Sequence, residues 1–154
     1  MFSKEEKSAL NHSFWNEFKN SMKKSSSQLQ RRVNWVQYPT HLRHTYLRLV
    51  FDQEKAAVCY DIQFKDEEIR VLFWEQLIEL RTLIENNMGV STIWIQNFET
   101  NEGVVISRLK WQDCSLNLHQ KRDWKKACIF FKERLIEFDA FYQEYKEILI
   151  NLIK

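Results

Sequence analysis

At 154 residues and 44% hydrophobic composition, the chain has the size of one globular domain with its own hydrophobic core. It contains 2 glycines and 1 proline, and neither G-x-x-x-x-G-K nor G-x-G-x-x-G occurs, which excludes the common nucleotide-binding loops. The net charge of +2 neither favours nor opposes a polyanionic partner. The charge is unevenly distributed, however, because residues 18–51 contain no acid and seven basic residues: Lys19, Lys23, Lys24, Arg31, Arg32, Arg43 and Arg48.

The remaining composition favours a reducing, non-membrane environment. Three cysteines without paired spacing are typical of reduced thiols. The N-terminal segment MFSKEEKSAL is charged rather than apolar, and no run approaches the roughly 18 apolar residues of a membrane span. We therefore expect a soluble cytoplasmic protein without a membrane partner.

The first elements in the chain are a helix and a short strand. A helix is predicted over residues 3–24, because apolar side chains recur every four positions: Leu10, Phe14, Phe18 and Met22. Ser3 and Glu6 fit a capping box at its start. A short strand is predicted over residues 33–38, ended by Pro39, which cannot donate to a strand ladder.

Residues 44–52 and 55–63 alternate apolar and polar side chains and predict an antiparallel hairpin with a loop at Gln53 and Glu54. Counting from that loop gives the cross-strand pairs Leu49 with Val58, Leu47 with Tyr60, Thr45 with Ile62 and Phe51 with Ala56. One face of the hairpin is then apolar and should lie on the core. The same count places Tyr46 opposite Asp61 and Arg48 diagonal to it, which predicts an Asp61–Arg48 pair.

The second half of the chain predicts a helix, a hairpin and a long helix. Asp66 can cap a helix over residues 66–88 that ends before Gly89. Its broad apolar stripe indicates a helix covered on more than one side: Ile69, Leu72, Phe73, Leu77, Leu80, Leu83, Ile84 and Met88. A hairpin is predicted from segments 92–98 and 104–111. A helix over residues 120–153 carries a heptad seam: Trp124, Cys128, Phe131, Leu135, Phe138, Tyr142, Tyr145, Leu149 and Leu152.

These elements predict a single α+β domain over residues 1–154 in the order α-β-β-β-α-β-β-α. We expect a mixed or antiparallel sheet covered by helices. The first six elements match the order of a restriction-endonuclease-like core, so that core is a possible arrangement.

Several segments together resemble a known family. In the first helix they are FSKEE at residues 2–6 with Phe14, Trp15 and Phe18, followed by Asn34, Trp35 and Tyr38. The others are DIQFKDEEIRVLFWEQLIELRTLIENNMG at residues 61–89, Asp123 with Trp124, and FFKERLIEFDAFY at residues 130–142. The chain resembles an uncharacterised bacterial domain-of-unknown-function family, found alone in Bacteroidota and elsewhere as the C-terminal part of restriction-endonuclease-like proteins. The resemblance implies no catalytic residue, and only hints at a nucleic-acid or defence context.

A nuclease hypothesis follows from Asp61-Ile62-Gln63 and Lys65, because many DNA nucleases carry an acid and a lysine or glutamine on one strand to hold Mg²⁺ beside a phosphate. Asp52 would be the second acid. The hairpin count separates the two acids by six residues, or roughly 20 Å at about 3.3 Å per residue. Two ligands of one Mg²⁺ must lie much closer, so the residues favour a structural Asp61, with no catalytic residue, cofactor or metal site.

The basic tract offers a binding hypothesis. Cations interleaved with aromatics can hold phosphates and stack bases, and this predicts nucleic-acid contacts at Lys23, Lys24, Arg31, Arg32, His44, Tyr46 and Arg48. The alternative is a solvated face that offsets the acids of the helix over residues 66–88. We therefore expect a binding or accessory module for nucleic acid or a protein partner. The alternatives are a Mg²⁺-dependent nuclease, active or degenerate, and a scaffold that self-associates through the C-terminal helix.

Overall fold

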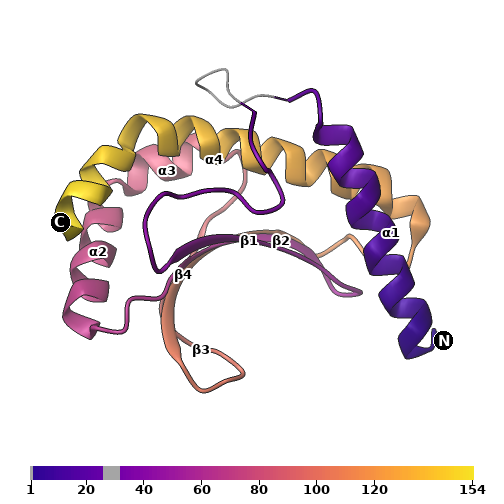
Figure 1. Ribbon diagram of the computed structural model, residues 1–154, viewed down its shortest axis with the longest axis horizontal. Coiled ribbons are helices and arrows are strands. Elements are labelled where there is room, and N and C mark those ends of the chain that lie inside the picture. The colour runs from indigo at the N-terminus through magenta and orange to yellow at the C-terminus, as the bar shows by residue number, and fades with distance from the viewer. Residues whose placement is uncertain (1, 26–31) are drawn as a thin grey trace.

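The computed structural model describes residues 2–25 and 32–154, and it confirms the α+β class (Figure 1). Four strands form one antiparallel sheet in the order β1-β2-β4-β3. The elements are α1 Lys4–Met22, β1 Thr45–Phe51, β2 Ala56–Ile62, α2 Glu67–Glu79, α3 Arg81–Asn87, β3 Ile93–Glu99, β4 Val105–Asp113, the 3-10 turn η1 Lys121–Asp123, and α4 Trp124–Ile153. None of the described helices is both long and apolar enough to cross a membrane.

The helices lie on one side of a strongly curved sheet, with α4 running along the molecule above it (Figure 1). The opposite side of the sheet, called the open face below, carries no helix among the described residues. The sheet therefore has one face in the core, between sheet and helices, and one face of mixed polar and apolar side chains that the strands alone form.

The predicted register of the first hairpin is confirmed at every position. Thr45 pairs with Ile62, Leu47 with Tyr60, Leu49 with Val58 and Phe51 with Ala56, as the loop count gives. Asp52 donates its backbone N–H to Lys55 O at 3.0 Å and closes the turn. The apolar residues of β2 on this face lie in the core.

β2 is buried on both faces, which the alternating sequence did not predict. All seven residues are buried, including Ala57, Cys59 and Asp61 on the open face. β2 lies between β1 and β4, so Asp61 is flanked by Tyr46 and Arg108 in the ladder. Long side chains from both neighbours cover the short ones of β2 on the curved sheet.

Most of the α4 seam is buried within the chain, as its heptad spacing predicts, whereas Cys128, Tyr145 and Leu152 are only partly buried. Phe131, Leu135, Phe138 and Tyr142 are at most 1% exposed. Phe138 stacks on Tyr142 with 5.4 Å between ring centroids and meets the Tyr60 ring of β2 at 5.1 Å. Self-association through α4 stays a prediction, and it would have to use the residues on the outer side of the helix.

α1 follows its predicted pattern. The Glu6 backbone N–H donates to Ser3 Oγ at 3.1 Å, and the Ser3 backbone N–H donates to Glu6 Oε1 at 3.3 Å, which confirms the capping box. Phe14 is fully buried and contacts Phe51 at the end of β1, with 4.6 Å between ring centroids. The helix therefore closes the core at the end of the sheet where the first hairpin turns.

The strand predicted over residues 33–38 is wrong, because this segment is a loop with a turn. Two hydrogen bonds hold this loop to α4 in place of a strand ladder. Tyr38 of the loop donates its hydroxyl to Asp139 Oδ1 at 2.5 Å, and Tyr142 of α4 donates its hydroxyl to Thr40 O. The order is therefore α-β-β-α-α-β-β-α. The third strand required by the restriction-endonuclease-like order is absent from the described residues.

The helix predicted over residues 66–88 is divided at Leu80, whose φ of −90° and ψ of 6° interrupt it. The Leu80 N–H is shared between the carbonyls of Gln76 and Leu77, which tightens the turn. The predicted stripe is only partly buried, since Leu72 is 45% exposed. Trp74, which is not a member of that stripe, is buried against Trp94 of β3.

Truncation of the α4 seam should destabilise the fold. Leu135 is fully buried, so Leu135→Ala should lower the free energy of unfolding by about 2–5 kcal/mol. Its neighbour Ile136 is 40% exposed, and Ile136→Ala should change it by less than about 1 kcal/mol. Urea denaturation measures both variants, and equal midpoints would contradict burial of the seam.

The two glycines provide a second test. Both have positive φ, +67° at Gly89 and +80° at Gly103, so a side chain is strained at either position. A Cβ at Gly89 would also lie 2.7 Å from Glu137 Oε2, whereas nothing lies within 4 Å at Gly103. Because Glu137 is held by Arg134, Gly89→Ala should cost about 2 kcal/mol and Gly103→Ala about 1 kcal/mol in thermal unfolding.

Equal melting temperatures for the two glycine variants would show that the Arg134–Glu137 pair moves aside without cost. A larger loss at Gly103 would contradict the packing described for the end of α3.

Candidate functional site

The open face gathers arginine, aromatic and aliphatic side chains around one acid. The strand registers and the alternation of side chains place on it Tyr46, Arg48 and Val50 of β1, Ala57, Cys59 and Asp61 of β2, Ile106, Arg108, Lys110 and Gln112 of β4, and Ile93, Ile95 and Phe98 of β3. This face contains three residues singled out in the sequence, Tyr46, Arg48 and Asp61.

Asp61 is the centre of this assembly. It is 1% exposed, and both of its carboxylate oxygens accept hydrogen bonds from guanidinium groups. Arg108 donates Nε to Oδ1 at 2.7 Å and Nη2 to Oδ2 at 2.9 Å, and Arg48 donates Nε to Oδ2 at 3.1 Å. The predicted Arg48 pair is thus confirmed, and Arg108 adds a bidentate partner. These hydrogen bonds also raise the pKa of Arg108, so its charge is permanent.

Each arginine also lies on an aromatic ring. The Arg48 guanidinium carbon is 4.6 Å from the centroid of Tyr46, and that of Arg108 is 4.2 Å from the centroid of Phe98. Cation–π contacts of this kind fix the orientation of a planar guanidinium. Gln63 completes the arrangement, because its Oε1 accepts Nη2 of Arg48 at 2.5 Å.

A hollow of about 570 Å³ opens beside these residues. Its remaining walls come from the turn between β3 and β4 and the start of β4, and its lining is Arg48, Asp61, Gln63, Phe98, Thr100, Asn101, Glu102, Val104, Ile106 and Arg108. The volume lies within the range of small-ligand sites. The arginines supply the positive side of this hollow.

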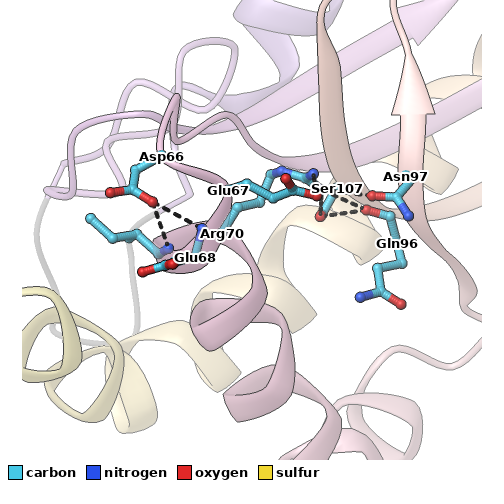
Figure 2. Close-up of polar contacts among 8 residues, drawn as sticks. Asp66, Glu67, Glu68, Arg70, Gln96, Asn97 and Ser107 are labelled. Atoms are coloured by element: carbon cyan, nitrogen blue, oxygen red, sulfur yellow. Dashed lines mark hydrogen bonds and ion pairs between the residues drawn. The ribbon is translucent and has the colours of Figure 1, made fainter.

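A third arginine, the buried Arg70, holds the strand that carries Phe98 (Figure 2). Arg70 reaches from α2 to the β3–β4 ladder and donates Nη1 to Gln96 O at 2.9 Å, Asn97 Oδ1 at 3.0 Å and Ser107 Oγ at 2.9 Å. The β3 register shifts between Ile95 and Phe98, and the shift leaves Phe98 opposite Ile106 on the open face. Arg70 therefore holds the irregular strand that supports Arg108.

Asp61 and Gln63 of the nuclease hypothesis lie together at Arg48, but the second acid, Asp52, does not join them. Asp52 caps the hairpin turn by accepting the backbone N–H groups of Glu54 and Lys55, at the opposite end of β2 from Asp61. Lys65 lies exposed beyond the end of β2, in a neighbouring hollow. A Mg²⁺ ion at Asp61 would have to displace an arginine, because guanidinium donors already occupy both oxygens.

Within residues 2–25 and 32–154, no three His, Cys, Asp or Glu side chains gather as a metal site requires. Cys59 lies on the open face but is 1% exposed, and burial raises its pKa to about 11, so it stays a neutral thiol.

The predicted nucleic-acid residues divide into two groups. Lys23, Lys24 and Arg32 are exposed near the C-terminal end of α1, where Lys23 and Arg32 line a hollow with Lys19 and Trp35. Tyr46 and Arg48 belong to the open face. Arg31 lies outside the described residues. His44 has a φ of 69° and packs its ring against Phe64, 6.0 Å between centroids, just before β1.

A third hollow joins the two groups. It is lined by Val36, Gln37 and Tyr38 of the loop and by residues 46–50 of β1. It shares Val36 with the hollow beside α1 and Arg48 with the hollow on the open face. The three hollows, together named the basic track, extend from the end of α1 past β1 onto the open face.

Sequence reasoning missed Arg108, Phe98 and Lys110. Residues 106, 108 and 110 alternate with core residues, so the sequence alone could have predicted that they share one face of the strand. Their meeting with Asp61 could not be predicted in this way, because β4 pairs with β2 across 47 residues of chain.

Removal of the central charge should destabilise the sheet. Asp61→Asn leaves two guanidinium groups without their carboxylate, and should lower the free energy of unfolding by about 1–3 kcal/mol. Asp52→Asn is the matched control, since an amide oxygen can still cap the turn, and should stay within about 0.5 kcal/mol. An Asp61→Asn protein that is more stable than the wild type in urea would contradict this structural role.

The comparisons with known proteins give one match. A family model described as a domain of unknown function, DUF4268, matches residues 10–146. Neither a curated protein nor a solved structure matches significantly. The matched region contains the first hairpin, the open face and most of α4. The chain therefore belongs to the DUF4268 family.

Proposed function

We propose that the chain is a nucleic-acid-binding module that holds a single strand along the basic track. The observation that carries this proposal is the continuity of the track, which links the acid-free sequence tract to the arginines of the open face. The middle hollow shares Val36 with the hollow beside α1 and Arg48 with the hollow on the open face, so one extended ligand can reach all three.

The charge of the track favours a polyanion. Five cations line it, Lys19, Lys23, Arg32, Arg48 and Arg108, against the acids Asp61 and Glu102. Among the described residues, neither the hollow beside α1 nor the hollow between residues 36–38 and β1 is lined by an acid. The outer side of α2 is the opposite, since Glu67, Glu68 and Glu75 line a shallow hollow there. A phosphate polymer would be attracted to one side of the molecule and repelled from the other.

A single strand fits the track better than a duplex. The track passes from the end of α1 along a sheet edge and onto the curved face, a path that requires a flexible backbone. Duplex DNA has a persistence length of about 150 base pairs and is stiff over such a distance. Tyr46, 43% exposed beside the path, offers a ring edge and face for base contacts.

Binding without cleavage is the role that the acids support. Asp61 is committed to two arginines and Asp52 to a turn, so neither carboxylate is available as a metal ligand. The resemblance to proteins that also carry restriction-endonuclease-like domains supports an accessory role beside a nuclease, in a restriction or defence context.

The test is a titration of fluorescent single-stranded and duplex oligonucleotides at several salt concentrations. Single-strand affinity should fall steeply with salt, by about 0.7 log units per log unit of salt for each phosphate contact. Changing Lys23, Lys24 and Arg32 together to Ala should reduce that slope by about 2. The control changes Lys125 and Lys126, exposed at the start of α4, and should leave the slope nearly unchanged.

Absence of oligonucleotide binding at low salt would exclude this function and favour a protein partner. Equal slopes for the two variants would show that the strand binds elsewhere. Tighter binding of the duplex would contradict the argument from the curved path.

A further inference from the structure

The open face contains two arginines that share one buried carboxylate and differ in exposure. Arg108 is mostly buried and supplies one hydrogen bond to each oxygen of Asp61. Arg48 adds a third, yet its side chain is 48% exposed. An exposed arginine held in one orientation is available to a ligand.

Both guanidinium groups are fixed on two sides. Arg108 is held between Asp61 and the ring of Phe98, and Arg48 between Asp61, Gln63 and the ring of Tyr46. Restricting flexible side chains before binding removes much of the entropy that a ligand contact would otherwise cost. The pair is thus organised in advance, which a solvated surface arginine is not.

The two groups retain unused donors. A guanidinium has five N–H donors, and Arg48 and Arg108 each use two nitrogens toward Asp61 or Gln63 within the described residues. About three N–H donors of each arginine are then free for other acceptors. Both arginines line the hollow of the open face, so the free donors can serve one acceptor group there.

We propose that Arg48 and Arg108 form a phosphodiester subsite, with Asp61 and Gln63 as positioning residues that hold the two guanidinium groups. This inference rests on the proposed function and specifies where the strand is gripped. Arg48, Arg108 and Asp61 together carry a net charge of +1, which can pair with a phosphodiester group of charge −1, while the exposed Glu102 lies in the β3–β4 turn at the wall of the hollow. Bidentate guanidinium contacts to phosphate oxygens are the geometry that arginine favours.

Positioning of the arginines by Asp61 and electrostatic attraction of the phosphate predict opposite effects of removing the Asp61 charge. Removing its negative charge would by Coulomb's law strengthen the binding of an anion. If Asp61 instead positions the arginines, Asp61→Asn should weaken binding, because the guanidinium groups then lose their common support. The sign of the change therefore separates positioning from long-range attraction.

The experiment uses the full chain and two probes, dimethyl phosphate and a fluorescent ten-nucleotide thymidine strand. Dimethyl phosphate should shift the Nε–H resonances of Arg48 and Arg108 in ¹⁵N-resolved NMR spectra. Arg48→Lys and Arg108→Lys keep the charge and lose the bidentate fork, and each should weaken the strand about ten-fold. Asp61→Asn and Gln63→Leu should each weaken it several-fold.

Arg81→Lys is the matched control. Arg81 also pairs with an acid, Glu85 at 3.1 Å, and lies on a ring, Trp94 at 5.3 Å, but it belongs to α3 outside the track. It should leave both probes unaffected. Since Arg48 and Gln63 lie at the partly exposed rim of the site, their variants test the subsite even if Asp61→Asn does not fold.

The outcomes distinguish this proposal from the function on which it rests. Dimethyl phosphate binding at the two arginines without strand binding would support the subsite and exclude the polymer ligand. Strand binding that depends on Lys23, Lys24 and Arg32 but not on Arg48 or Arg108 would overturn the subsite alone. Tighter binding by Asp61→Asn would overturn the positioning role. Preference for a polyglutamate peptide, with the same variant effects, would overturn phosphate as the ligand.

Discussion

Burial of β2 on both faces is the constraint on which the rest of the structure depends. On one face, Tyr60 and its neighbours pack under the aromatic residues of α4. On the other face no helix is available among the described residues, so flanking strands must cover β2 with their own side chains. An acid at position 61 is then withdrawn from water and requires charged partners. Arg48 and Arg108 cover the open face of β2 and also pair with the Asp61 carboxylate.

The same constraint changes the meaning of the motif that suggested a nuclease. An acid followed by glutamine on a strand is compatible with a metal site when the carboxylate faces an open cleft. Here the carboxylate lies beneath two guanidinium groups, and the glutamine orients one of them. The acid therefore serves as a common hydrogen-bond acceptor for the two arginines.

The loop over residues 32–44 connects the cations at the end of α1 to the arginines of the open face. Tyr38 and Tyr142 bind it to α4 through hydrogen bonds to Asp139 and Thr40, and burial raises the pKa of Tyr142 to about 12. The hydroxyls therefore remain protonated donors at neutral pH. Because these bonds hold the loop against β1, residues 36–38 line the middle of the track. The buried hydroxyls of Tyr38 and Tyr142 thus determine where the middle hollow of the basic track lies.

The sequence by itself determined the elements whose signals are local. The register of the first hairpin, the caps of α1 and α2, and the buried seam of α4 all follow from spacing within a short segment. The break at Leu80 and the loop at residues 33–38 were decided by tertiary contacts, since their patterns fitted a continuous helix and a strand equally well. The meeting of Asp61 with Arg108 and Phe98 also required the tertiary structure. Strand order is set by how the whole sheet packs under α4, and no local period encodes which strands become neighbours.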